Sequence, residues 1–196
     1  GGAALLGRAR LGGAAVPGHA AGNDGVALAA RHRVDSVEHG TLMDAATAKL
    51  MAANNVYYVP TLSVINGYKE RLAANPDAYT GEVLEKIRWR IDVTGQSLRI
   101  ARANGVRIAY GTDAGVSKHG RNADEFELLV QFGMTPAEAI KAATVNAADL
   151  LGIADQVGTL EPGKAADLIA VDADPLADVR VLKQVRYVMR AGETVR

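Results

Sequence analysis

Three residues that could do chemistry together stand where predicted strands end: His19, His39 and Asp113. The carboxyl ends of parallel strands share one edge of an α/β sheet or barrel, and sites form at that edge. Two imidazoles and one carboxylate suit zinc or a similar divalent metal. Each residue also has an ordinary interpretation, because a strand-end histidine is often only hydrogen-bonded and an aspartate after Gly-Thr often caps a helix. Their shared placement favours a metal site and leaves those alternatives open.

The elements that must position these residues alternate between strand and helix. Apolar, β-branched runs predict strands over residues 14–20, 36–38, 56–62 and 106–111, each followed by helical sequence. This alternation predicts parallel βαβ units over residues 1–155. Strands without intervening helices follow, at 167–171 and in a hairpin around Ala191-Gly192, which predicts a separate small β segment over residues 156–196.

The helices show clear local signals. Asp44 is a predicted N-cap for a helix that runs to about Asn54, and Thr135 begins a capping box for a helix that ends near Leu151. Residues 82–104 form one long amphipathic pattern, which predicts a single helix. The polar stretch before it, residues 63–81, is predicted to be an excursion that covers a site.

Composition places the chain among ordinary globular proteins. Its 196 residues are 48% hydrophobic and 22% charged, the formal net charge is zero and there is no cysteine. This excludes collagen-like and disordered chains, disulfides and thiolate metal sites, and nothing indicates nucleic acid or an anionic membrane as a partner. No apolar run reaches the roughly 18 residues that a membrane span needs. The first ten residues read as the tail of a helix, so we expect a piece of a longer chain.

Seven motifs spread along the sequence carry a resemblance to a known family. They are GHA at 18–20, VDSVEHGT at 34–41, VPTL at 59–62, GTDAG at 111–115, HGxN at 119–122, GMTPAEAI at 133–140 and GTLEPGKAADL at 158–168. From about Leu11 to Arg196 the chain resembles the C-terminal half of a metal-dependent amidohydrolase of the prolidase-like Xaa dipeptidase branch. The resemblance implies strands five to eight of a (β/α)₈ TIM-like barrel, plus the C-terminal part of a small β-sandwich.

The resemblance also assigns roles to the three strand-end residues. His19 and His39 would bind one metal, and Asp113 would touch a second metal and shuttle the catalytic proton. The cofactor implied is a divalent metal, zinc, with two ions in the intact enzyme. The His-x-His pair and the lysine that the family carries on earlier strands have no counterpart here, and Ala21 stands where an aromatic residue is frequent. We therefore expect this chain alone to bind metal weakly and to catalyse little.

Further residues are assigned to the substrate or set aside. His119 lies in a loop that borders the substrate in the dipeptidase-like branch, and an exposed loop histidine is the equal alternative. Arg121 suits a substrate carboxylate, against the more common surface arginine. Thr61 is predicted to face the site. Glu38 directly precedes His39, and strand alternation predicts that it points to the opposite side.

The leading hypothesis is a fragment of an enzyme that hydrolyses the amide bond of a dipeptide or an N-acyl amino acid. The alternatives are a cyclic amide hydrolase or deaminase of the same superfamily, and a truncated, non-catalytic half barrel. The expected partner is a small-molecule or dipeptide substrate, with no nucleic acid and no membrane; a homo-oligomer is left open. A cytoplasmic location is favoured, and an export signal upstream of Gly1 stays open.

Overall fold

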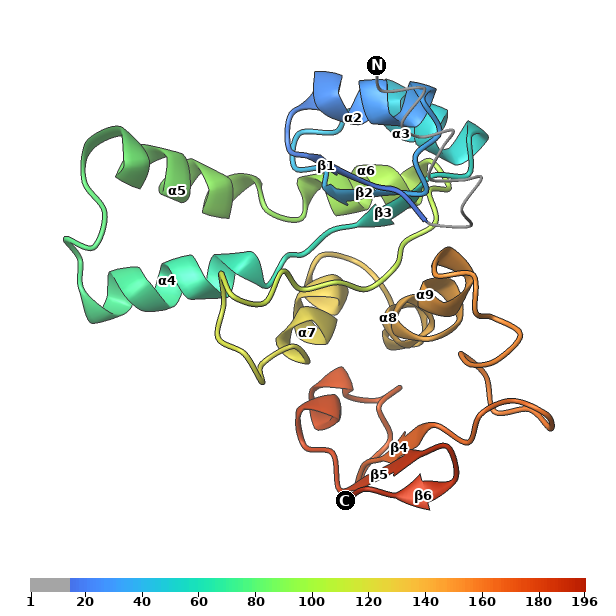
Figure 1. Cartoon of the computed structure of the whole chain (residues 1–196). Helices are drawn as coiled ribbons and strands as arrows, with labels where there is room; N and C mark the ends of the chain where they lie inside the picture. The colour runs from blue at the N-terminus through green and yellow to red at the C-terminus, as the bar shows by residue number, and fades with distance from the viewer. Residues whose placement is uncertain (1–14) are drawn as a thin grey trace.

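The computed structural model describes residues 15–196, so the helix tail expected before Leu11 lies outside the described residues. Its first sheet is parallel, with strands in the order β1 (Pro17–Ala20), β2 (Ser36–His39) and β3 (Tyr57–Val59). The register pairs His19 with Glu38 and Ser36 with Tyr57. The predicted parallel arrangement is confirmed for these three strands, and their carboxyl ends meet at one edge (Figure 1).

The strand predicted over residues 106–111 is reduced to a single parallel bridge between Tyr58 and Ile108. Tyr58 donates its backbone N–H to the carbonyl of Arg107, and Ala109 donates back to Tyr58. The ladder stops there because β3 is three residues long and is followed by Pro60, which has no amide hydrogen to donate. The segment still lies beside β3, so it delivers Asp113 to the same edge.

Two helices follow the first two strands, as predicted. Helix α2 (Asn23–Arg31) follows β1, and α3 (Ala45–Ala53) follows β2. The Asp44 side chain accepts a hydrogen bond of 2.7 Å from the backbone N–H of Thr47, so the predicted N-cap is confirmed.

The region between β3 and residue 106 differs from the prediction. The expected polar excursion contains α4 (Val64–Ala74), and the expected long helix is two helices, α5 (Gly81–Val93) and α6 (Gln96–Ala103). The break falls at Gly95, whose φ is +83°. A Cβ there would lie 2.1 Å from the Phe132 ring, so the close approach of a distant side chain enforces the break. In Figure 1, α4 and α5 extend away from the rest of the molecule.

Three short helices connect the parallel sheet to the C-terminal part: α7 (Asp124–Gln131), α8 (Pro136–Ala143) and α9 (Val145–Leu150). The capping box at Thr135 is confirmed, because its hydroxyl accepts from the Glu138 N–H and the Glu138 carboxylate accepts from the Thr135 N–H. The predicted single helix from Thr135 to Leu151 is wrong, since the backbone leaves the helical region at Thr144.

The C-terminal segment forms a second, antiparallel sheet, with β4 (Leu168–Ala170), β5 (Tyr187–Arg190) and β6 (Glu193–Thr194) in sequence order. A short 3₁₀ helix, η1 (Val179–Lys183), precedes β5. The predicted hairpin is confirmed, with positive φ at both Ala191 and Gly192, as a two-residue turn of type I′ requires. The boundary at residues 155/156 stays a prediction. In Figure 1, α7, α8 and α9 lie between the two sheets.

The main core lies between the parallel sheet and the helices packed on it. Its fully buried members come from α2, β2, α3, α6, α7 and α8, and include Val26, Val37, Met51, Leu98 and Leu129. This packing fixes the strand ends relative to one another. Within residues 15–196, none of the helices is both long and apolar enough to cross a membrane.

Candidate active site

The two strand-end histidines are in contact. His19 on β1 and His39 at the end of β2 have ring centroids 4.4 Å apart, at an interplanar angle of 73°. Strand pairing brings them together, because β1 and β2 are adjacent parallel strands and Ala20 is paired with His39. Two of the three predicted metal-ligand positions are therefore side by side.

The backbone at this edge is left-handed at three successive strand ends. His39 has φ of +69°, Thr61 +49° and Asp113 +50°, and these are three of the six non-glycine residues with positive φ in residues 15–196. Positive φ is costly for a β-branched residue such as Thr61, and such strain persists only where the surroundings over-determine it. Strain gathered on one edge supports a functional role for that edge.

A hydrogen-bond chain fixes the tautomer of His39. The Thr61 hydroxyl donates its one hydrogen to the carbonyl of Pro60 at 2.8 Å. It must then accept from Nδ1–H of His39, which lies 2.7 Å away. The lone pair is left on Nε2 of His39. Metal-binding histidines are oriented in this way, with one ring nitrogen held by a hydrogen bond and the other free to bind.

The charged groups at the three strand ends influence one another's pKa. Burial lowers the pKa of His39, the nearby His19 lowers it further, and Asp113 opposes the change. Asp113 itself is exposed at the edge. Its charge acts on two groups of β2, since it also raises the pKa of Glu38.

The prediction that Glu38 points away from the site is wrong. Its carboxylate accepts a 2.6 Å hydrogen bond from the Ser36 hydroxyl, on its own side of β2. Burial raises the pKa of Glu38, while Ser36 and the charge of His19 lower it. Glu38 is the register partner of His19 and shares its face of the sheet, and the His39 ring contacts His19 as well, because the strand is not regular at His39, where φ is positive. Glu38 therefore belongs to the surroundings of the two histidines.

The side chains at this edge meet only part of what a bound zinc or similar divalent metal requires. His19 and His39 fit as an imidazole pair, with Nε2 of His39 free to bind. Within the described part of the chain, no three His, Asp or Glu side chains lie close enough together to hold one ion. Asp113 is thus near the pair without completing a three-donor cluster. The described residues provide part of a metal site, formed by the two imidazoles.

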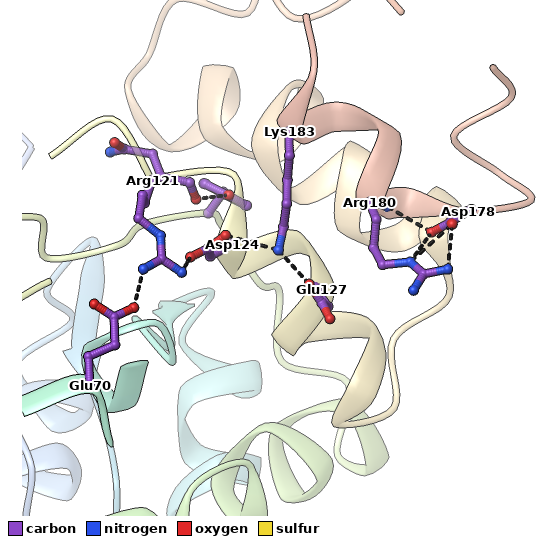
Figure 2. A network of polar contacts seen from close by, with 9 residues as sticks. Glu70, Arg121, Asp124, Glu127, Asp178, Arg180 and Lys183 are labelled. Atoms are coloured by element: carbon purple, nitrogen blue, oxygen red, sulfur yellow. Dashed lines mark hydrogen bonds and ion pairs between the residues drawn. The ribbon is translucent and has the colours of Figure 1, made fainter. Parts of the chain in front are cut away.

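The residues assigned to the substrate have different surroundings. Thr61 is buried, and its hydroxyl is occupied by His39 and Pro60. Figure 2 shows that Arg121 bridges two carboxylates, those of Glu70 on α4 and Asp124 on α7, the latter at 2.6 Å. His119 is exposed on the loop before α7. His119 is therefore accessible, whereas the guanidinium of Arg121 is already paired.

Sequence reasoning missed Glu125, the second residue of α7. Its side chain is fully buried, and its two oxygens accept from the backbone N–H groups of Leu62 and Ser63 at 2.8 and 2.6 Å. Burial raises the pKa of Glu125 to about 7, although the bonds to Leu62 and Ser63 lower it. An acidic residue in the first turn of a helix ordinarily indicates only a favourable interaction with the helix dipole, so no local signal marked it.

Comparisons with known proteins agree with this geometry. The family model described as "Amidohydrolase family" matches residues 4–195. The ochratoxinase of Aspergillus niger is 36% identical over 183 residues, which cover 91% of this chain and 37% of that protein. The crystal structure of a Xaa-Pro dipeptidase with bound methionine superposes with a TM-score of 0.91 at 40% identity, covering 99% of this chain and 48% of the other.

A prolidase complexed with N-methylphosphonate-L-proline superposes with a TM-score of 0.88 at 29% identity, over 99% of this chain and 48% of its own. The chain thus spans about half the length, or less, of the relatives it matches. The match runs through both sheets and covers nearly every residue. The chain therefore has an α/β amidohydrolase fold and belongs to the amidohydrolase family.

Proposed function

We propose that the protein containing this chain is a metal-dependent hydrolase that cleaves the amide bond of a dipeptide or an N-acyl amino acid. The observation that carries the proposal is the oriented His39, which keeps Nε2 free beside His19 at the strained edge. In this assignment β1, β2, β3 and the segment 106–111 are strands five to eight of the barrel. Residues 156–196 then belong to the smaller β-sandwich.

In this proposal the two imidazoles bind metal and Asp113 transfers the proton. His19 and His39 would hold one of two divalent ions, for which zinc is our choice. When bound, the metal polarises the scissile carbonyl and lowers the pKa of water. The carboxylate of Asp113 accepts a proton from the attacking water while the oxygen of that water bonds to the carbonyl carbon. Asp113 returns that proton to the amide nitrogen as the C–N bond breaks, so that the nitrogen leaves as a neutral amine.

Relatives of similar structure support the substrate class. One is a Xaa-Pro dipeptidase with bound methionine, and another is a prolidase that holds a phosphonate analogue bearing proline. Such substrates end in a carboxylate, and His119 stands on the loop that would border it. Arg121 could bind that carboxylate only by exchanging Glu70 or Asp124 for it.

The test uses the longer protein that contains this chain, assayed with Xaa-Pro dipeptides, N-acyl amino acids and cyclic amides. We expect turnover of a dipeptide or an N-acyl amino acid, and its loss in His19→Ala and in Asp113→Ala with the fold retained. His32→Ala is the matched control, because His32 is exposed at the end of α2, away from the site. Full turnover in either site variant would refute the assignment of that residue.

Ring opening without dipeptide turnover would replace our substrate class with the cyclic amide alternative. The non-catalytic alternative is tested separately by metal content and oligomeric state. A stable dimer of this chain that holds no metal would favour it over hydrolysis.

A further inference from the structure

The fully buried carboxylate of Glu125 binds the chain just beyond β3, next to Thr61 of the candidate active site. It accepts from two consecutive backbone N–H groups, those of Leu62 and Ser63. No part of the side chain is exposed, and a buried carboxylate is tolerated only when its oxygens are hydrogen-bonded. The carboxylate and the chain reversal after β3 therefore depend on each other.

The two N–H groups that Glu125 binds directly follow Thr61, the residue that orients His39. Thr61 holds its strained φ of +49° while its hydroxyl accepts from Nδ1–H of His39. A shift of the backbone at Leu62 would move the Thr61 hydroxyl and release the imidazole. Two hydrogen bonds therefore connect the buried carboxylate to the His39 ring: one from the Leu62 N–H to Glu125, and one between the adjacent Thr61 and Nδ1 of His39.

The same segment also reaches Asp113. The hydroxyl of Ser63, itself buried, donates to the backbone carbonyl of Thr112 at 3.2 Å. The Thr112 hydroxyl accepts from the side-chain amide of Asn122 at 3.1 Å. Thr112 immediately precedes Asp113, whose φ is +50°. The segment that Glu125 binds therefore contacts His39 through Thr61 and the residue before Asp113 through Ser63.

We propose that Glu125 is a positioning residue, which fixes the chain after β3 and thereby aims His39 and Asp113 at a common space. The inference deepens the proposed function and rests on it. Its rival is that Glu125 only stabilises the core. The two roles predict different effects of a substitution at Glu125. A group that only stabilised the core would not alter the environment of the His39 ring in a variant that still folds.

The test compares Glu125→Gln with Glu127→Gln by nuclear magnetic resonance on this chain. A glutamine offers one acceptor oxygen where the carboxylate has two, so one of the two N–H groups loses its partner. We expect the amide signals of Leu62 and Ser63 and the ring signals of His39 to shift in Glu125→Gln. Glu127 is on the same helix and pairs with Lys183, so Glu127→Gln is expected to leave those signals in place.

Activity of the longer protein provides the second readout. At equal metal content, we expect Glu125→Gln to lower kcat by about 10- to 100-fold, as removal of groups that orient ligands does, with KM nearly unchanged. A folded Glu125→Gln with unshifted His39 signals, or with full kcat, would overturn the inference. If the parent protein cleaves no amide, the proposed function fails, and the resonance comparison alone decides whether Glu125 positions the two residues.

A milder variant covers the case in which Glu125→Gln does not fold. Ser63→Ala keeps both backbone bonds to Glu125 and removes the hydroxyl that donates to Thr112 and also interacts with the Glu125 carboxylate. We expect it to shift the Asp113 backbone signals while leaving the His39 ring signals unchanged. Unchanged Asp113 signals in Ser63→Ala would refute the link between Glu125 and Asp113.

Discussion

The two sheets of this molecule differ in how deeply their strands are buried. Every residue of β3 is buried, and the first two residues of β2 are buried as well, whereas β4, β5 and β6 contain no buried residue. Positive φ angles occur in both regions for different reasons. In the antiparallel sheet they fall at Ala191 and Gly192, where the hairpin turn requires them.

At the parallel sheet the positive φ angles fall where the chain leaves the carboxyl edge, at His39, Thr61 and Asp113. Each of these residues takes part in a short turn, because the backbone N–H of Gly40 donates to Glu38, that of Val64 to Thr61 and that of Val116 to Asp113. Directly after Thr61, the buried carboxylate of Glu125 accepts from the backbone N–H groups of Leu62 and Ser63. The comparison teaches that the parallel sheet is part of a packed core that holds the site side chains in place. The antiparallel sheet is joined to that core mainly through surface contacts.

The largest expected contrast between the two sheets is in core substitutions. Leu98 of α6 is fully buried in the core around the parallel sheet, and Ile169 of β4 is 53% exposed. We expect Leu98→Ala to lower the free energy of unfolding by about 2–5 kcal/mol, because it leaves a cavity. Ile169→Ala should change it by less than about 0.5 kcal/mol. Urea denaturation measures both; equal effects would mean that the C-terminal sheet has a core of its own.

Local signals in the sequence predicted features of both sheets and of the helices. The N-cap of Asp44, the capping box of Thr135 and the Ala191-Gly192 hairpin are each decided within a few residues, and all three are confirmed. The carboxyl ends of β1 and β2 could also be predicted to within one residue, whereas β3 ends before the predicted residue 62 and the run at 106–111 forms a single bridge. The expectation that His19 and His39 share one sheet edge follows from those strand ends, and their rings are in contact.

The features that could not be predicted depend on partners far along the chain. The helix break at Gly95 is enforced by Phe132, and the role of Glu125 depends on Leu62 and Ser63, more than sixty positions earlier. The prediction for Glu38 fails because alternation assumes a regular strand up to His39. Pairwise contacts of this kind leave no periodic trace in a single sequence.

A second contrast concerns pH. The pKa of Glu125 is raised from 4.5 to about 7 in the folded chain, so the folded state keeps a proton that the unfolded state has already released. This contribution is full below pH 4.5 and is lost as the pH rises to about 7, with a slope of up to about 1.4 kcal/mol per pH unit. Urea denaturation of the parent and Glu125→Gln across this range should give a difference in stability that shrinks with rising pH. A constant difference would contradict the raised pKa.

The smallest expected effect tests how the C-terminal part is joined to the packed core. Figure 2 shows Lys183 of η1 reaching two carboxylates of α7, Glu127 and the mostly buried Asp124, the latter at 2.9 Å. Arg180, on the same 3₁₀ helix, forms its ion pair with Asp178, two residues away, and the charge of Glu127 acts on it without a direct bond. We expect Lys183→Gln to lower stability by about 0.5 kcal/mol, and by less in high salt.

Arg180→Gln is the matched control for this ion pair. It removes one positive charge from η1 but breaks no bond to α7, because Asp178 belongs to the same segment. Thermal unfolding at low and high ionic strength should therefore distinguish the two variants. If both lowered the midpoint equally, the net charge of η1 would matter more than the bridge to α7. A salt-dependent loss confined to Lys183→Gln would identify that lysine as a cross-link between the C-terminal segment and the helix that carries Glu125.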